Sequence, residues 1–290
     1  MIQRNNNLSV LPFYENVDEQ NHRRTYAYGE VYPLYVPMGS IPPFQIIRRH
    51  NGATVADVML HRADGGFEDD ITDEMEGAGL TVIEYAASNY DIVMYPSSAP
   101  HNITKAEGRY FLKLFMSDGT VYWSDIITVV ADMSGFLNIR WWDAEDLVMD
   151  GCRISYANQF RNSLWLNTQL GKPDYDFEEE GENRDGYFYP EKMISEKRYK
   201  CVFLAPEYLC DVMRFIRLSD FVVVRDRYGH SYRCDTFLCT PKWEEQGDLA
   251  SVDVEFTCET VAKKIGKGYI KLGQGDDFND DFNNDYDIVD

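Results

Sequence analysis

The sequence has no long hydrophobic runs and no surplus of positive charge. The longest apolar runs, residues 126–131 and 221–224, have the length of strands and fall short of the ~18 residues that a membrane-spanning helix needs. Acidic residues outnumber basic ones, 49 to 28, and the net charge of -21 repels both a phosphate backbone and an anionic lipid surface. We therefore expect neither a membrane nor a nucleic acid as partner.

Closely spaced metal ligands are also lacking. The chain has six cysteines, and none belongs to a C-x-x-C pair of the kind found in zinc sites. The opening MIQRNNNLSV has no apolar segment of a secretory signal, which predicts folding in a reducing cytoplasm. We expect buried, reduced thiols at Cys152, Cys201, Cys210, Cys234, Cys239 and Cys258, and no metal or cofactor.

Catalytic motifs are missing from the chain. The histidines, at positions 22, 50, 61, 101 and 230, are not accompanied by a G-x-S-x-G nucleophile motif. GKG at 266–268 lacks the rest of a P-loop, and the Asp277 calcium-like run has Phe282 and Ile288 where Gly and Glu are required. With 49 acidic residues, a carboxylate pair at glycosidase spacing can arise by chance. The sequence thus predicts that the protein is not an enzyme.

Aromatic residues are abundant, with 20 Tyr and 16 Phe, and they favour pleated, half-buried strands. At 290 residues the chain is about twice the usual domain size. We expect a mainly β protein of two domains, built from β-sandwiches, with one amphipathic helix in an α+β second domain.

Residues 1–43 are predicted to form an extended arm, because five prolines, at positions 12, 33, 37, 42 and 43, remove amide donors and fix the backbone. The arm carries many aromatic residues, so it should lie against its own domain or against a neighbouring subunit.

Residues 44–132 show short strands separated by turns, the pattern of an immunoglobulin- or fibronectin-like sandwich. In RYFLKLFM, Tyr110, Leu112, Leu114 and Met116 alternate on one face before a turn at 117–119. The Cys-Trp-Cys pattern of true immunoglobulins is missing, because no cysteine precedes Cys152.

A second β-rich domain is predicted over residues 136–265, after a junction at 132–135. Leu209, Val212, Met213 and Ile216 follow helical spacing, which indicates a helix over about 206–217. Residues 174–190 read as an acidic hairpin, and SVDVEFTC at 251–258 alternates as a half-buried strand.

Residues 266–290 read as a flexible acidic tail with seven Asp and no periodicity. Phe278, Phe282 and Tyr286 recur every fourth residue and are candidate contacts for a neighbouring subunit.

Trp141, Trp142, Trp165 and Tyr187 could stack on sugars, although aromatic residues in β proteins more often belong to the core. A carbohydrate- or receptor-binding module is therefore the alternative function, with a possible glycan as ligand. A glycan-cleaving enzyme is a weaker alternative.

Several segments of the sequence resemble a known group of proteins. LPFYENVDEQNHRRTYAYGEVYPLYVP, IPPFQIIR and RYKCVFLAPEYLCDVMRFIRLSDFVVVRDRYGHSYRCDTFLC resemble uncharacterised proteins encoded among virion genes of gut-bacterial tailed phages and prophages. The second half is also coarsely similar to distal-tail and tail-tube proteins, in which a β-sandwich flanked by a helix assembles into a ring.

The resemblance implies a non-enzymatic structural component of the tail, tail tip or baseplate. Such a protein would be made in the bacterial host cytoplasm and would enter the virion on assembly. Its partners would be copies of itself and other virion proteins.

The reading of the cysteines can be tested by titrating thiols in denaturant without reductant. We expect all six to react, because no pair has the spacing of a metal site and no export signal is visible. Stoichiometric zinc, or a melting temperature that falls sharply with reductant, would contradict this expectation.

Overall fold

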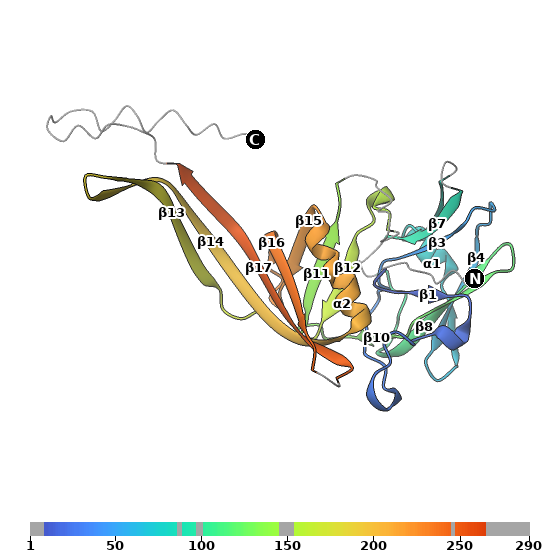
Figure 1. The fold of residues 1–290 in the computed structure, drawn as a ribbon. Helices are drawn as coiled ribbons and strands as arrows, with labels where there is room; N and C mark the ends of the chain where they lie inside the picture. Colours follow the sequence, from blue (N-terminus) through green and yellow to red (C-terminus); the bar gives the residue numbers. More distant parts are fainter. Residues whose placement is uncertain (1–8, 86–88, 97–100, 145–153, 245–246, 265–290) are drawn as a thin grey trace. The chain divides into compact units, whose positions relative to one another are not determined.

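A computed structural model describes residues 9–85, 89–96, 101–144, 154–244 and 247–264 (Figure 1). The described chain divides into two compact units. The larger contains the residues up to Asp176 together with Glu196–Thr260, and the smaller contains Phe177–Ser195 and the residues from Val261. The mainly β fold predicted from the sequence is confirmed.

The first half of the larger unit contains ten strands and one short helix. These are β1 (Phe13–Tyr14), β2 (Tyr35–Pro37), β3 (Phe44–Arg49), β4 (Val55–Arg62), β5 (Phe67–Asp70), α1 (Thr72–Gly77), β6 (Thr81–Tyr85), β7 (Tyr90–Tyr95), β8 (Gly108–Met116), β9 (Val121–Ser124) and β10 (Ile127–Val130).

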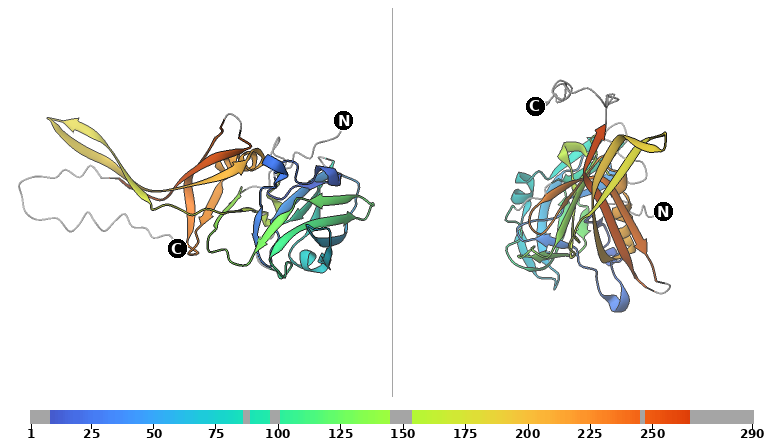
Figure 2. Two further views of the ribbon diagram at one scale, coloured as in Figure 1. Left: turned by 90° about the horizontal axis from the view of Figure 1, so that it is seen from below. Right: turned by 90° about the vertical axis from the view of Figure 1, so that its left-hand side faces the viewer.

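These strands form two sheets, drawn in blue to green in Figures 1 and 2. In one, β8 pairs with β4, β9 and β10; in the other, the order is β3-β7-β6. Phe44 and Tyr95 of the small sheet belong to the same core as Leu112 and Leu114 of the large one. The predicted alternation along β8 is confirmed, since Tyr110, Leu112, Leu114 and Met116 are all buried.

The remaining elements follow after residue 136. They are β11 (Leu137–Trp142), β12 (Asn162–Leu166), β13 (Asp174–Arg184), β14 (Tyr187–Pro206), α2 (Glu207–Arg214), β15 (Phe221–Arg225), β16 (Ser231–Lys242) and β17 (Leu249–Lys264). Short 3₁₀ turns occur at Val17–Glu19, Ala27–Gly29, Ala157–Gln159 and Ile216–Leu218.

The predicted helix is present as α2, followed by a 3₁₀ turn that continues to Leu218. Leu209, Val212, Met213 and Ile216 are buried, as the helical spacing requires. The helix contacts β16, and the sheet order beneath it is β12-β11-β15-β16-β17. The short α1 was not predicted, because its one buried residue, Met75, leaves no periodicity to detect.

The N-terminal arm lies against its own chain. Val10, Leu11, Leu34 and Val36 are buried in the core. Strand β1 pairs with β9, and β2 pairs in parallel with β10 and, through Tyr35, with β12. The arm therefore joins strands from both predicted domains into one path of hydrogen-bonded strands.

The predicted junction at 132–135 lies within the larger unit. Residues from the second half also cover the small sheet, since Ile154, Tyr156 and Phe160 pack on Ile92 and Met94. The side chain of Gln45 accepts a hydrogen bond from the Ser155 backbone N–H at 2.9 Å. The division into two domains at residues 132–135 stays a prediction.

A buried ion pair fastens the arm. Arg24 and Asp125 are joined by a 2.8 Å contact between Nε and Oδ2, and their side chains are 2% and 0% exposed. The Asn21 backbone N–H also donates to Asp125, and Arg24 donates to the carbonyl oxygens of Tyr32 and Ile126. Burial raises the pKa of Asp125, while the Arg24 guanidinium and the Asn21 N–H oppose that shift.

Removing either member of this pair should destabilise the larger unit strongly. We expect Arg24→Met and Asp125→Asn each to lower the free energy of unfolding by about 3–5 kcal/mol, because each leaves the other member of the ion pair buried without its partner. Denaturant unfolding monitored by tryptophan fluorescence measures the loss.

The matched control is Arg23→Met, whose ion pair with Asp211 has both side chains 36% exposed. It should cost less than about 1 kcal/mol. Equal losses for Arg23→Met and Arg24→Met would contradict the role given to the buried pair.

Candidate interaction site

The acidic insertion folds as the hairpin that its sequence indicates. Strands β13 and β14 are neighbours in the sheet and are joined by a turn at Asp185 and Gly186. Both turn residues are left-handed, with φ of 52° and 83°, the backbone of a type I′ turn. That turn matches the right-handed twist of a two-stranded ribbon, which explains why the Asp-Gly pair stands there.

The part of this hairpin in the smaller unit exposes aromatic side chains. Phe177, Tyr187, Phe188 and Tyr189 are 68%, 70%, 46% and 52% exposed. Because successive residues of a strand point to opposite faces, the run from Tyr187 to Tyr189 places rings on both faces of the ribbon. The ribbon therefore presents apolar surface on either side.

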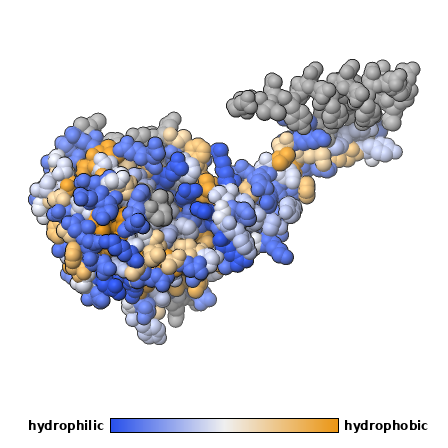
Figure 3. All heavy atoms as spheres, turned by 180° about the vertical axis from the view of Figure 1, so that it is seen from behind, coloured by the Kyte–Doolittle hydropathy of each residue, from blue (hydrophilic) through white to orange (hydrophobic). Residues whose placement is uncertain are grey.

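Acidic side chains accompany these rings. Glu178, Glu179, Glu180 and Glu182 are exposed on β13, and Glu180 pairs with Lys192 at 3.3 Å. On the face seen in Figure 3, hydrophobic residues in orange are interspersed with hydrophilic residues in blue. The hairpin is thus an aromatic surface that carries negative charge.

Glycine is required at one position of the hairpin. A Cβ atom on Gly181 would lie 2.1 Å from the carbonyl oxygen of Tyr189 and 2.8 Å from the Cα of Pro190. Both atoms are backbone, so neither can rotate away as a side chain can. The two strands therefore approach one another at Gly181 more closely than any other residue would permit.

The structure separates the interaction residues proposed from the sequence. Trp141 is 1% exposed and lies in the core, where it presents no surface to a partner. Trp142 is half-buried on the opposite face of β11, and Tyr187 is exposed on the hairpin. Phe278, Phe282 and Tyr286 lie outside the described residues. Trp165, which was also considered for sugar stacking, is half-buried. The residues considered for sugar stacking therefore differ in burial and do not form one exposed surface.

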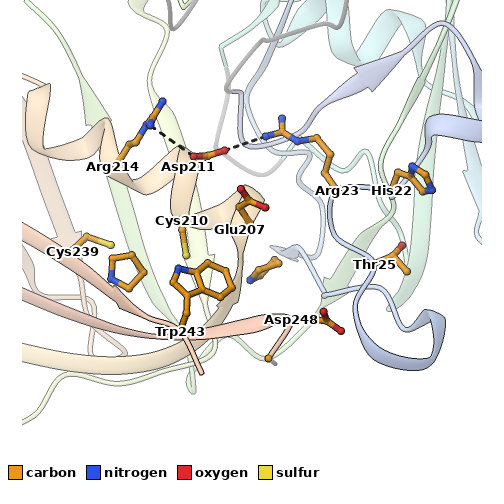
Figure 4. A pocket seen from close by; sticks show the side chains of 13 residues that line it. His22, Arg23, Thr25, Glu207, Cys210, Asp211, Arg214, Cys239, Trp243 and Asp248 are labelled. Atoms are coloured by element: carbon orange, nitrogen blue, oxygen red, sulfur yellow. Dashed lines mark hydrogen bonds and ion pairs between the residues drawn. The ribbon is translucent and has the colours of Figure 1, made fainter. Parts of the chain in front are cut away.

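The larger unit has an open pocket of about 750 Å³ (Figure 4). Arg23, Cys210, Asp211, Cys239 and Trp243 are among the residues that line it. Asp211 is paired with Arg23 at 3.4 Å and with Arg214 at 4.0 Å. Burial raises the pKa of the Cys210 thiol to about 11 and that of Cys239 to about 12, so both are protonated at neutral pH. The pocket therefore holds a paired carboxylate and protonated thiols, and His22, Glu207 and Asp248 also line it.

The five described cysteines are free; Cys152 lies outside the described residues. Cys201 and Cys258 are buried as expected, and the others are half-buried. Cys234 and Cys239 are five residues apart on β16, yet both pack against the same core. A β-bulge between Cys234 and Thr236 shifts the alternation of β16 by one residue.

Within the described ranges, no three His, Cys, Asp or Glu side chains are grouped so that they could hold a metal ion. No helix in the same ranges has the length and apolar character to cross a bilayer. No protein-family model matches the chain, and no curated protein sequence matches it.

The close approach at Gly181 gives a prediction for the hairpin. Gly181→Ala should separate β13 from β14 locally, and amide hydrogen exchange of the hairpin around residues 182–189 should quicken at least tenfold. Gly135→Ala is the control, since a Cβ there meets no atom within 4 Å. Unchanged exchange in Gly181→Ala would show that the strands can spread without loss of pairing.

Proposed function

We propose that the chain is a non-enzymatic structural protein of a tailed phage or prophage virion, acting in tail, tail-tip or baseplate assembly. Its function is to make contacts with copies of itself and with other virion proteins. The observation that carries this proposal is the hairpin surface of Phe177, Tyr187, Phe188 and Tyr189, all at least 46% exposed. The phage context comes from the sequence resemblance.

Contact with a partner would stabilise the hairpin. Strand β13 ends the strand order β16-β17-β14-β13 and is therefore an edge strand, and rings on both β13 and β14 are exposed. Covering a large apolar side chain contributes about 1.5–3 kcal/mol before the costs of association. Four exposed rings can therefore supply an interface anchor, and Tyr is among the residues that most often act as anchors at protein interfaces.

The charge of the hairpin restricts its partner. Residues 177–195 contain six acidic and two basic side chains. Like charges placed opposite one another are repulsive, so the complementary surface should be neutral or basic where it meets the glutamates. This requirement favours specific docking over nonspecific association.

The described pocket supports an assembly role over catalysis. Of its three acidic residues, Glu207, Asp211 and Asp248, Asp211 is held between two arginines, and the pocket's thiols have pKa values raised by burial. A nucleophile needs a lowered pKa or an adjacent base to react at neutral pH. These groups are better suited to packing and ion pairing.

The hairpin role is tested by substituting exposed rings. We expect the wild-type chain to form larger species with rising concentration in sedimentation velocity. Tyr187→Ser/Tyr189→Ser should form clearly smaller species at the same concentrations, with an unchanged melting temperature. Tyr228→Ser is the matched control, because Tyr228 has the same 70% exposure as Tyr187 but lies on the larger unit.

The control should associate like the wild type. A wild-type chain that stays monomeric, or a double variant that associates normally, would refute self-association through the hairpin.

A further inference from the structure

Four side chains of the larger unit form a stack: Arg161 directly precedes β12, and Trp142, Phe221 and Arg233 lie on the adjacent strands β11, β15 and β16. The Arg161 guanidinium lies 4.5 Å from the Trp142 ring, the Trp142 and Phe221 rings stack at 5.3 Å and 15°, and the Arg233 guanidinium lies 5.1 Å from the Phe221 ring. Trp142 and Phe221 are direct partners between β11 and β15. The stack is therefore set by strand register, and it places a cation at each end of an aromatic pair.

Two more arginines share this sheet face. Arg140 lies opposite Val223, and Val223 lies opposite Arg233. With strands about 4.8 Å apart, the Cα atoms of Arg140 and Arg233 are about 10 Å apart. Arg225 follows two residues after Val223 and so points to the same side. We call Arg140, Arg161, Arg225 and Arg233 the arginine face.

The arginine face has no counter-ion on the described chain. None of its four members forms an ion pair with a described residue, although the sequence holds 49 acidic residues. Asp143 and Asp220, which adjoin Trp142 and Phe221 in sequence, accept backbone N–H groups instead: Asp143 from Asp220 at 3.1 Å, and Asp220 from Ala144 at 2.9 Å.

Arg140 shows that the face is unsatisfied. Its Nε is buried and has no hydrogen-bond partner among the described atoms. Burial lowers the pKa of Arg140, and the neighbouring Arg161 and Arg225 lower it further. A buried donor left without an acceptor is unfavourable, so an anion on this face would relieve both the repulsion and the missing bond.

The sequence supplies an anion with matching chemistry. Residues 275–290 contain seven Asp together with Phe278, Phe282 and Tyr286, so carboxylates can meet the guanidinium groups while rings extend the stack. The chain beyond Lys264 reaches on the order of 90 Å when extended. Tethering within an assembly raises the local concentration of such a segment to about the millimolar range.

A nucleic acid fits less well than an acidic segment. Phosphate-backbone binding depends on neutralising many phosphates, and the arginine face offers four cations. The net charge of -21 on the whole chain repels phosphates as well.

We propose that the arginine face binds the acidic segment 275–290 of a neighbouring copy of this chain. The proposal rests on the assembly function above and identifies a second contact that is independent of the hairpin. It makes the association heterologous, because one copy contributes the segment and the other contributes the sheet face.

Peptide binding tests the contact directly. The acceptor is the full-length chain with the seven Asp of residues 275–290 changed to Asn, and the probe is a fluorescein-labelled peptide of residues 275–290. We expect micromolar binding that weakens with salt, at least tenfold weaker binding after Arg225→Gln/Arg233→Gln, and less than a twofold change after Arg49→Gln, an exposed arginine on β3.

Equal binding by the Arg225→Gln/Arg233→Gln acceptor would overturn the proposal, as would tighter binding of a 16-nucleotide single-stranded DNA. A peptide with all its Asp changed to Asn should not bind, and binding of that peptide would also count against the proposal.

A mixing experiment identifies the source of the segment. The donor is a full-length chain with Arg225→Gln/Arg233→Gln and an intact tail; the acceptor has the neutral tail and intact arginines. Both carry Tyr187→Ser/Tyr189→Ser, so the hairpin contact is absent and its failure is scored separately. We expect a donor–acceptor complex in sedimentation velocity. Peptide binding without that complex would place the segment on its own chain and overturn the intermolecular contact.

Discussion

The buried Arg24–Asp125 ion pair is the contact on which the larger unit depends. Its 2.8 Å contact, 2% and 0% exposed, fixes the arm at a point where the chain has no regular secondary structure. With the arm held there, β2 can pair with β10 and β12 and so connect the two halves. A buried charge pair is costly unless every polar atom is satisfied, which explains why Asn21 and two carbonyl oxygens surround it.

The sequence correctly predicted those secondary-structure elements that depend on the residue pattern within a short window. Alternation at Tyr110–Met116 and helical spacing at Leu209–Ile216 are properties of short windows, and both faces are buried as expected. The arm could be read only as extended, since its partners lie about a hundred residues away in Asp125 and β10. The bulge in β16 was also invisible, because an extra residue in a strand leaves no mark on composition.

The candidate sites also differ in whether a short segment of sequence or the pairing of distant strands determines them. The acidic hairpin at residues 174–190 was predicted from the sequence, and Tyr187, proposed as an interaction residue, is exposed on it. Trp141 and Trp142 are adjacent in sequence, yet one is in the core and the other is in the stack, and only the sheet register decides which. The arginine face could not be predicted, because Arg161, Phe221 and Arg233 meet through strand pairing across long stretches of chain.

Two surfaces of the described chain suit contact with a partner: an aromatic hairpin with negative charge, and a cationic sheet face that has no counter-ion among the described residues. The proposed role of these contacts is assembly into a virion. Quantitative mass spectrometry of particles purified from bacteria that carry the gene for this chain tests that role most directly. The account predicts the protein in a fixed number of copies relative to the other tail components. Particles that are complete and infectious but lack it would contradict the account.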